Sequence, residues 1–211
     1  MKDIPLFTTQ NGVGSLALEE IPYKGCAYIR VQSSADPKVF LNECADFCKA
    51  AGATHCYATG VGADQFPYYT SVIQMKRMLE GLPESDAAVF PVQENTIEKW
   101  CEIYNERMRD VPNAATMTMS KAKALVEKGS CYFVHRQGAL LGIGCVNCDR
   151  IDAIATVHKG SGKDVLIALC RALTGDTVTV EAATTSQRAI KLYEGLGFIN
   201  SKHLFDWYQI F

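Results

Sequence analysis

A loop of small residues between Lys159 and Lys163 is the part of the sequence best suited to chemistry. It reads Lys159-Gly-Ser-Gly-Lys163, follows an apolar stretch at 151–157 and opens a helical pattern that continues to Leu173. Such a loop leaves backbone N–H groups at the start of a helix, where the helix dipole favours an anion. A phosphate or a pyrophosphate is the natural ligand, and a tight strand-to-helix turn without a ligand is the alternative.

Two well-known nucleotide loops do not fit this segment. The loop that binds nucleoside triphosphates needs glycine at position 157 and serine or threonine at position 164, where this chain has Val157 and Asp164. The three-glycine spacing of a dinucleotide-binding loop is also missing. The loop therefore predicts an anion site without identifying its ligand.

A second segment, from Ser186 to Phe198, reads Ser-Gln-Arg-Ala-Ile-Lys-Leu-Tyr-Glu-Gly-Leu-Gly-Phe. It resembles the pattern Asn-x-x-Ala-x-x-Leu-Tyr-x-x-x-Gly-Phe that closes the GNAT (Gcn5-related N-acetyltransferase) superfamily. The residues in register with that pattern are Ala189, Leu192, Tyr193, Gly197 and Phe198. The asparagine position is Ser186, which has a shorter hydrogen-bonding side chain. The resemblance covers residues 88–211.

The small-residue loop then looks like the coenzyme A pyrophosphate loop of that family, Arg/Gln-x-x-Gly-x-Gly/Ala. In one register Lys159, Gly162 and Asp164 occupy the three marked positions, and in the other Val157, Gly160 and Gly162 occupy them. The first register keeps a cation but places a carboxylate near the pyrophosphate, and the second keeps both glycines but begins with an apolar residue. The sequence leaves both registers open.

The resemblance implies direct transfer of an acetyl group from acetyl-coenzyme A to a primary amine of a small molecule or a protein. The thioester would lie between splayed strands at 151–157 and 177–182, where a backbone N–H near Thr156 and Val157 polarises its carbonyl group. Tyr193 occupies the position of the general acid that protonates the departing thiolate, or else is a core aromatic. The residues expected to bind the acyl donor are Thr156, Val157, Lys159, Gly160, Ser161, Gly162, Lys163, Asp164 and Ser186.

The sequence offers two candidates for the general base and no signature of a particular acceptor. Asp152 and Glu181 are the candidate bases, because an amine must lose a proton before it attacks, and each could equally be a solvated residue at a strand end. The alternative function is a non-catalytic module of the same fold that binds acyl-coenzyme A or a partner. A structural protein without a ligand is a third possibility.

The cysteines predict neither a disulfide framework nor a metal centre. The chain has nine of them, most within apolar stretches, so we expect buried free thiols. Cys145 and Cys148 have the spacing of a zinc knuckle, but no second pair lies at a suitable distance. We therefore expect no metal ion.

The elements around these motifs predict an α/β (α+β) fold with a GNAT-like mixed sheet flanked by helices. Residues 88–211 read as strand, two helices, three-strand meander, helix, strand, helix and strand. Residues 1–87 read as an N-terminal half-domain, with the strand–helix–strand unit 26–60 followed by a helix or a strand near 71–79. This unit can be laid on 171–205, so a degenerate GNAT-like half and a coincidental likeness are both open. It could also form a dimer surface.

The composition restricts the kinds of partner that the protein is expected to bind. The 211 residues are 48% hydrophobic and 21% charged, with a net charge of -2. This balance is typical of a globular protein and argues against a nucleic-acid partner, which needs a basic face. No apolar stretch reaches the roughly 18 residues of a membrane span, and residues 1–14 lack a signal-peptide core. We therefore expect a cytoplasmic protein whose partners are acetyl-coenzyme A and an amine acceptor, with no membrane partner.

Overall fold

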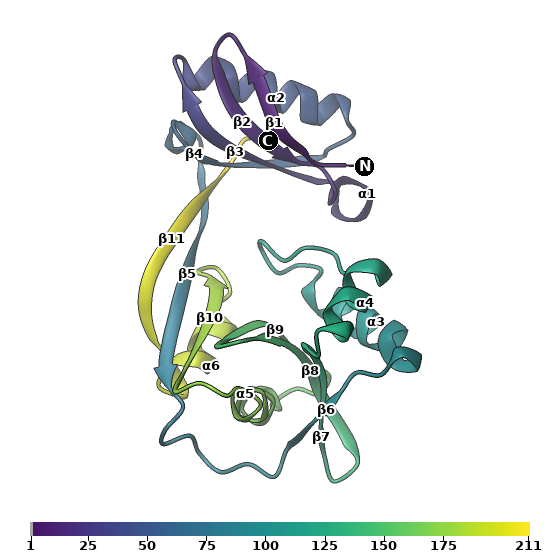
Figure 1. Cartoon of the computed structure of the whole chain (residues 1–211). Coiled ribbons are helices and arrows are strands. Elements are labelled where there is room, and N and C mark those ends of the chain that lie inside the picture. Colours follow the sequence, from purple (N-terminus) through teal and green to yellow (C-terminus); the bar gives the residue numbers. More distant parts are fainter. Residues whose placement is uncertain (1) are drawn as a thin grey trace. The chain divides into compact units, whose positions relative to one another are not determined.

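The computed structural model describes residues 2–211, which form two compact units (Figure 1). One unit contains residues 2–72 together with Leu204–Phe211, and the other contains Ile73–His203. The predicted boundary between residues 87 and 88 does not coincide with this division. The reason is that two long strands, β5 (Tyr68–Met78) and β11 (Ile199–Gln209), contribute residues to both units.

The first unit is a sheet with one long helix on one face. Its strands are β1 (Ile4–Thr9), β2 (Gly12–Ala17), β3 (Cys26–Ser34) and β4 (His55–Gly60), and its helices are α1 (Ile21–Lys24), α2 (Pro37–Ala50) and the short 3₁₀ turn η1 (Ala63–Gln65). Strands β1, β2 and β3 form an antiparallel meander, and β4 pairs with β3 in parallel. Alternate apolar residues of β3 pack on α2, which confirms the predicted strand, helix and strand at 26–60.

The second unit holds the remaining elements. Its strands are β6 (Ala88–Pro91), β7 (Cys131–Arg136), β8 (Ala139–Asn147), β9 (Arg150–Thr156) and β10 (Thr177–Ala183). Its helices are η2 (Glu94–Thr96), α3 (Ile97–Met108), α4 (Met119–Glu127), α5 (Gly162–Arg171) and α6 (Gln187–Gly195). The strand order is β11-β5-β10-β9-β8-β7-β6.

The sheet of this second unit has a hydrophobic core on each face, and Figure 1 shows helices on both sides of it. Helices α5 and α6 cover one face, where Val165, Leu166 and Leu169 are fully buried. Helices α3 and α4 cover the other, around Trp100 and Ile143. This arrangement confirms the predicted mixed sheet flanked by helices. Within the part of the chain that is described, no helix is long and apolar enough to cross a membrane.

The two units share one order of elements: an antiparallel meander, a helix, and a strand parallel to the last strand of the meander. In the first unit this is β1-β2-β3-α2-β4, and in the second it is β7-β8-β9-α5-β10. The predicted overlay of 26–60 on 171–205 does not match this topology, because β5 separates β10 from β11.

The two copies differ where the last two strands meet. Strands β3 and β4 pair along their length, from Cys26 opposite His55 to Val31 opposite Gly60. At the start of α2, the Asp36 carboxylate accepts a hydrogen bond from the Val39 amide (3.2 Å), and Pro37 has no N–H to offer. The Asp36 side chain therefore binds one of the first amides of α2.

Candidate active site

Strands β9 and β10 separate toward their carboxyl ends. They are register partners at two positions, Arg150 opposite Thr179 and Ile151 opposite Val180. Beyond those positions the described strands are no longer paired with each other. An opening between two parallel strands exposes backbone groups that a sheet would normally satisfy. It lies where the sequence predicted splayed strands at 151–157 and 177–182.

The backbone of β9 offers amides to this opening. The Val157 N–H donates to the Leu141 carbonyl oxygen of β8 (2.8 Å), so this predicted polarising group is already engaged. Hydrogen bonds alternate along an antiparallel pair, so the Thr156 N–H lies on the opposite edge of β9, toward β10. Of the two predicted amides, only that of Thr156 is placed to face the opening.

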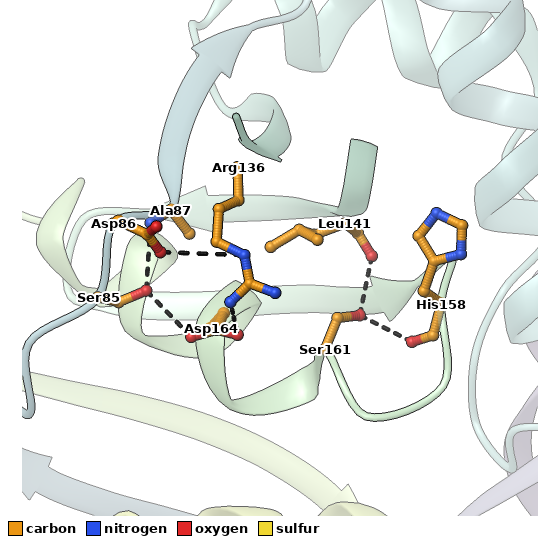
Figure 2. Close-up of polar contacts among 8 residues, drawn as sticks. All are labelled: Ser85, Asp86, Ala87, Arg136, Leu141, His158, Ser161 and Asp164. Atoms are coloured by element: carbon orange, nitrogen blue, oxygen red, sulfur yellow. Dashed lines mark hydrogen bonds and ion pairs between the residues drawn. The ribbon is translucent and has the colours of Figure 1, made fainter. Parts of the chain in front are cut away.

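The loop after β9 is fixed by Ser161, which is 6% exposed. Its hydroxyl lies within hydrogen-bond distance of the Leu141 carbonyl oxygen (3.0 Å) and the His158 carbonyl oxygen (2.8 Å), as Figure 2 shows. Ser161 therefore does not cap the first amides of α5 with its side chain. Gly160 has a φ of 92°, which favours glycine, and a Cβ atom at Gly162 would lie 3.1 Å from the Leu192 side chain.

Asp164, in the first turn of α5, is paired on both carboxylate oxygens. Oδ1 accepts a hydrogen bond from the Ser85 hydroxyl (3.1 Å), and Oδ2 accepts one from Arg136 Nη1 (2.9 Å). Arg136 Nε also lies 3.9 Å from a carboxylate oxygen of Asp86. The predicted loop residues Lys159 and Lys163 are exposed. The sequence does not reveal Arg136, which reaches α5 from the end of β7.

Ser186, which is also predicted to bind the acyl donor, occupies the N-cap position of α6. It follows the carboxyl end of β10, at the edge of the sheet where the loop follows β9. Its hydroxyl makes no capping hydrogen bond, and its carbonyl oxygen accepts from the amides of Ala189 (2.9 Å) and Ile190 (3.1 Å). The side chain of Ser186 is therefore not used to start the helix.

Tyr193 lies on α6 and is 5% exposed. Its ring packs against Phe198 with 5.7 Å between centroids. Burial, and to a smaller extent the Cys170 thiol, raises the pKa of Tyr193 to about 12. The hydroxyl is therefore protonated at neutral pH, the form that a proton donor requires.

The two predicted bases, Asp152 and Glu181, are held by one guanidinium. They are the first residues beyond the last register pair of β9 and β10, and Asp152 is the extra residue of a β-bulge opposite Cys145 and Val146. Arg150 forms a hydrogen-bonded ion pair with Asp152, and its Nη1 lies 3.6 Å from Glu181. The hydrogen bond to Asp152 raises the pKa of Arg150. Arg150 is a second residue that the sequence motifs do not single out.

The described cysteines are all free thiols. Cys145 is a register partner of Cys131 on the neighbouring strand and is buried, whereas Cys148 lies exposed in the turn that follows β8. Among residues 2–211 no group of three or more His, Cys, Asp or Glu side chains is placed to hold a metal ion.

The buried thiol of Cys170 predicts that the folded protein loses stability at alkaline pH. Burial raises the pKa of the Cys170 thiol to about 12, whereas the unfolded chain ionises this thiol near pH 8.5 to 9. Its contribution is complete below that range and is lost as the pH rises toward 12. We expect this group to lower the free energy of unfolding by about 1.5 kcal/mol between pH 8 and pH 10, as measured by urea denaturation. Cys170→Ala should flatten the pH dependence by that amount, and an equal slope in both proteins would contradict it.

Comparison with known proteins gives structural likeness only. No protein-family model and no curated protein sequence matches the chain. A GCN5-related N-acetyltransferase from Sphaerobacter thermophilus is 10% identical with a TM-score of 0.59, over 94% of this chain and 76% of that one. A GNAT-family acetyltransferase from Colwellia psychrerythraea is 11% identical with a TM-score of 0.53, over 97% and 84%.

A third similar structure is a functionally unknown conserved protein from Staphylococcus epidermidis. It is 13% identical with a TM-score of 0.58, over 99% of this chain and 94% of that one. At such identities the likeness concerns the fold. The chain therefore has the fold of the GCN5-related N-acetyltransferase superfamily, which its closing motif resembles.

Proposed function

We propose that this protein is an N-acetyltransferase that moves an acetyl group from acetyl-coenzyme A to a primary amine. The observation that carries the proposal is the opening between β9 and β10, which pair at only two positions. The loop of the predicted anion site follows β9, and the helix that carries Tyr193 follows β10. The fold shared with solved acetyltransferases supports this reading.

The diphosphate of acetyl-coenzyme A would bind where the loop meets α5. The first amides of a helix lack partners within the helix and attract anions. Lys159 and Lys163 add positive charge there. The left-handed φ of Gly160 and the close approach of Leu192 to Gly162 favour the register in which Val157, Gly160 and Gly162 match the family loop.

The chemistry would be direct transfer. The amine nitrogen attacks the thioester carbonyl carbon, the carbon–sulfur bond breaks, and the departing thiolate takes a proton. The Thr156 N–H would donate to the carbonyl oxygen as negative charge develops on it. Tyr193 would supply the proton to sulfur and regain one from solvent.

The acceptor must lose a proton before it attacks. Asp152 and Glu181 stand at the narrow end of the opening and would receive this proton directly or through water. Arg150 holds both carboxylates in place. We therefore assign Arg150 a positioning role in the proposed reaction.

A second candidate function is binding of acyl-coenzyme A without transfer. Two observations favour it: Tyr193 is 5% exposed, and both candidate bases are already paired with Arg150. Such a protein would keep the loop and the opening but lack turnover.

Two measurements separate these functions. Calorimetric titration with acetyl-coenzyme A tests binding, and release of free coenzyme A thiol in the presence of a panel of amines tests transfer. Binding with amine-dependent thiol release supports the acetyltransferase, and binding without release for every amine supports the binding module. Absence of binding would reject both.

A further inference from the structure

The carboxylate of Asp164 stands where the proposed ligand brings negative charge. An acidic side chain in the first turn of a helix is favoured by the helix dipole, but a diphosphate at the same helix start would be repelled by it. If the proposed function holds, this chain must avoid that repulsion. In the register favoured above, Asp164 lies two residues after the last marked glycine, Gly162, and within the first turn of α5.

The surroundings of Asp164 turn its charge away from the loop. Figure 2 shows its carboxylate beside Ser85 and Arg136, whereas His158 and Ser161 lie on the other side of the helix start. The Arg136 Nη1 to Oδ2 distance is 2.9 Å, and the side chain of Asp164 is 26% exposed. Because the two charges are opposite, an ion pair of this length weakens the repulsion that the carboxylate alone would exert on a nearby anion.

Residues 83–86 hold this pair in place. Arg171, at the last turn of α5, donates to the carbonyl oxygens of Ser85 (2.7 Å) and Pro83 (3.1 Å). At the first turn of the same helix, the Ser85 hydroxyl donates to Asp164. The segment is therefore tied to both ends of α5, and Asp164 is held in one orientation.

We propose that Arg136 neutralises Asp164 and thereby allows the diphosphate of acetyl-coenzyme A to bind at the start of α5. Arg136 acts through Asp164, so it is a positioning residue and does not itself have to touch the ligand. With the pair intact, the cationic side chains at the loop are those of Lys159, Lys163 and Arg107, whose Nη2 donates to the Val157 carbonyl oxygen (3.2 Å). Without Arg136, the carboxylate is exposed to the ligand.

The test is a double-mutant cycle read by calorimetric titration with acetyl-coenzyme A at low salt. Arg136→Ala should weaken binding about tenfold, and adding Asp164→Asn to that variant should restore it to within about threefold of the wild type. Arg136→Lys should also stay within about threefold, because it keeps the charge. The deficit of Arg136→Ala should shrink in 0.5 M salt.

A matched control is Lys99→Ala, which removes the cation of the exposed Lys99–Glu102 ion pair on α3 (2.8 Å) and changes the net charge equally. It should leave binding unchanged. Melting temperatures without ligand identify any variant that has lost its fold, and Arg136→Gln then replaces Arg136→Ala.

Four outcomes bear on the proposal. Restoration by Asp164→Asn supports it. Weak binding that Asp164→Asn does not restore overturns it, because Arg136 then contacts the ligand itself. Unchanged binding by Arg136→Ala also overturns it while leaving the proposed function intact, since the wild type still binds. If the wild type does not bind acetyl-coenzyme A, the proposed function and this inference are both overturned, and the titration of the wild type alone shows it.

Discussion

Replacing Tyr193 with phenylalanine is expected to lower the turnover number for acetyl transfer by about 100-fold or more. The change removes only the hydroxyl, the group proposed to protonate the departing thiolate. The ring should still pack against Phe198, because its size and apolar surface are unchanged. Affinity for acetyl-coenzyme A should therefore stay within about threefold of the wild type. Steady-state thiol release and calorimetric titration measure the two effects separately.

A matched control for this experiment is Tyr132→Phe on β7, which makes the same chemical change at a half-buried position outside α6. It should leave both turnover and affinity close to wild type. An unchanged turnover number in Tyr193→Phe would remove Tyr193 from the mechanism. A parallel loss of binding would instead assign it a structural role.

The second large effect is expected for Gly142→Ala on β8. A Cβ atom at this position would lie 2.3 Å from the Ala155 carbonyl oxygen and 3.0 Å from a methyl group of Val165. The first of these atoms is backbone of β9, so the strands must move apart to make room. We expect a loss of about 3 kcal/mol in unfolding free energy, measured by urea denaturation. Because Gly142 is the register partner of Thr156, affinity for acetyl-coenzyme A should also fall.

Gly175→Ala is the control for this prediction. Its Cβ atom would meet nothing closer than 3.7 Å, and the position is not in the left-handed region. Stability should change by less than about 0.5 kcal/mol. If Gly142→Ala were as stable as Gly175→Ala, close packing between β8 and β9 would not be what requires glycine at Gly142.

The sequence predicts most of the second unit because its elements carry strong local signals. The helical spacing of apolar residues marks α3, and the Gly-rich turn at 158–162 marks the start of α5. The turn at Gln137 and Gly138, both with positive φ, marks the hairpin of β7 and β8. The segment 71–79 is left open between helix and strand. It is a strand, and its side chains do not alternate simply, since Val72 and Ile73 are both buried.

The hairpin at the start of the chain could not be predicted, because its reasons lie elsewhere in the fold. Strand β1 is partly exposed along its length and contains Pro5. Gly12 and Gly14 look like turn residues, yet both are needed where the Phe40 ring of α2 packs onto β2. A Cβ atom on Gly12 would lie 2.7 Å from that ring.

The same difference between local and long-range signals applies to the residues of the candidate site. The loop and Tyr193 can be found from sequence, because each is part of a short contiguous motif. The arginines cannot, because their roles depend on pairing between distant segments: Arg136 meets Asp164 across 28 positions of sequence. Likewise Glu181 comes close to Arg150 only because β10 lies beside β9.

The start of α2 has a consequence for how many ligands the chain can hold. Its Asp36 carboxylate already binds the Val39 amide, Pro37 has no N–H to offer, and β3 and β4 are paired where β9 and β10 are not. The repeated order of elements therefore does not imply a repeated binding site. A titration should reach saturation at one molecule of acetyl-coenzyme A per chain. The repeated order of elements is then a feature of the fold that adds no second ligand.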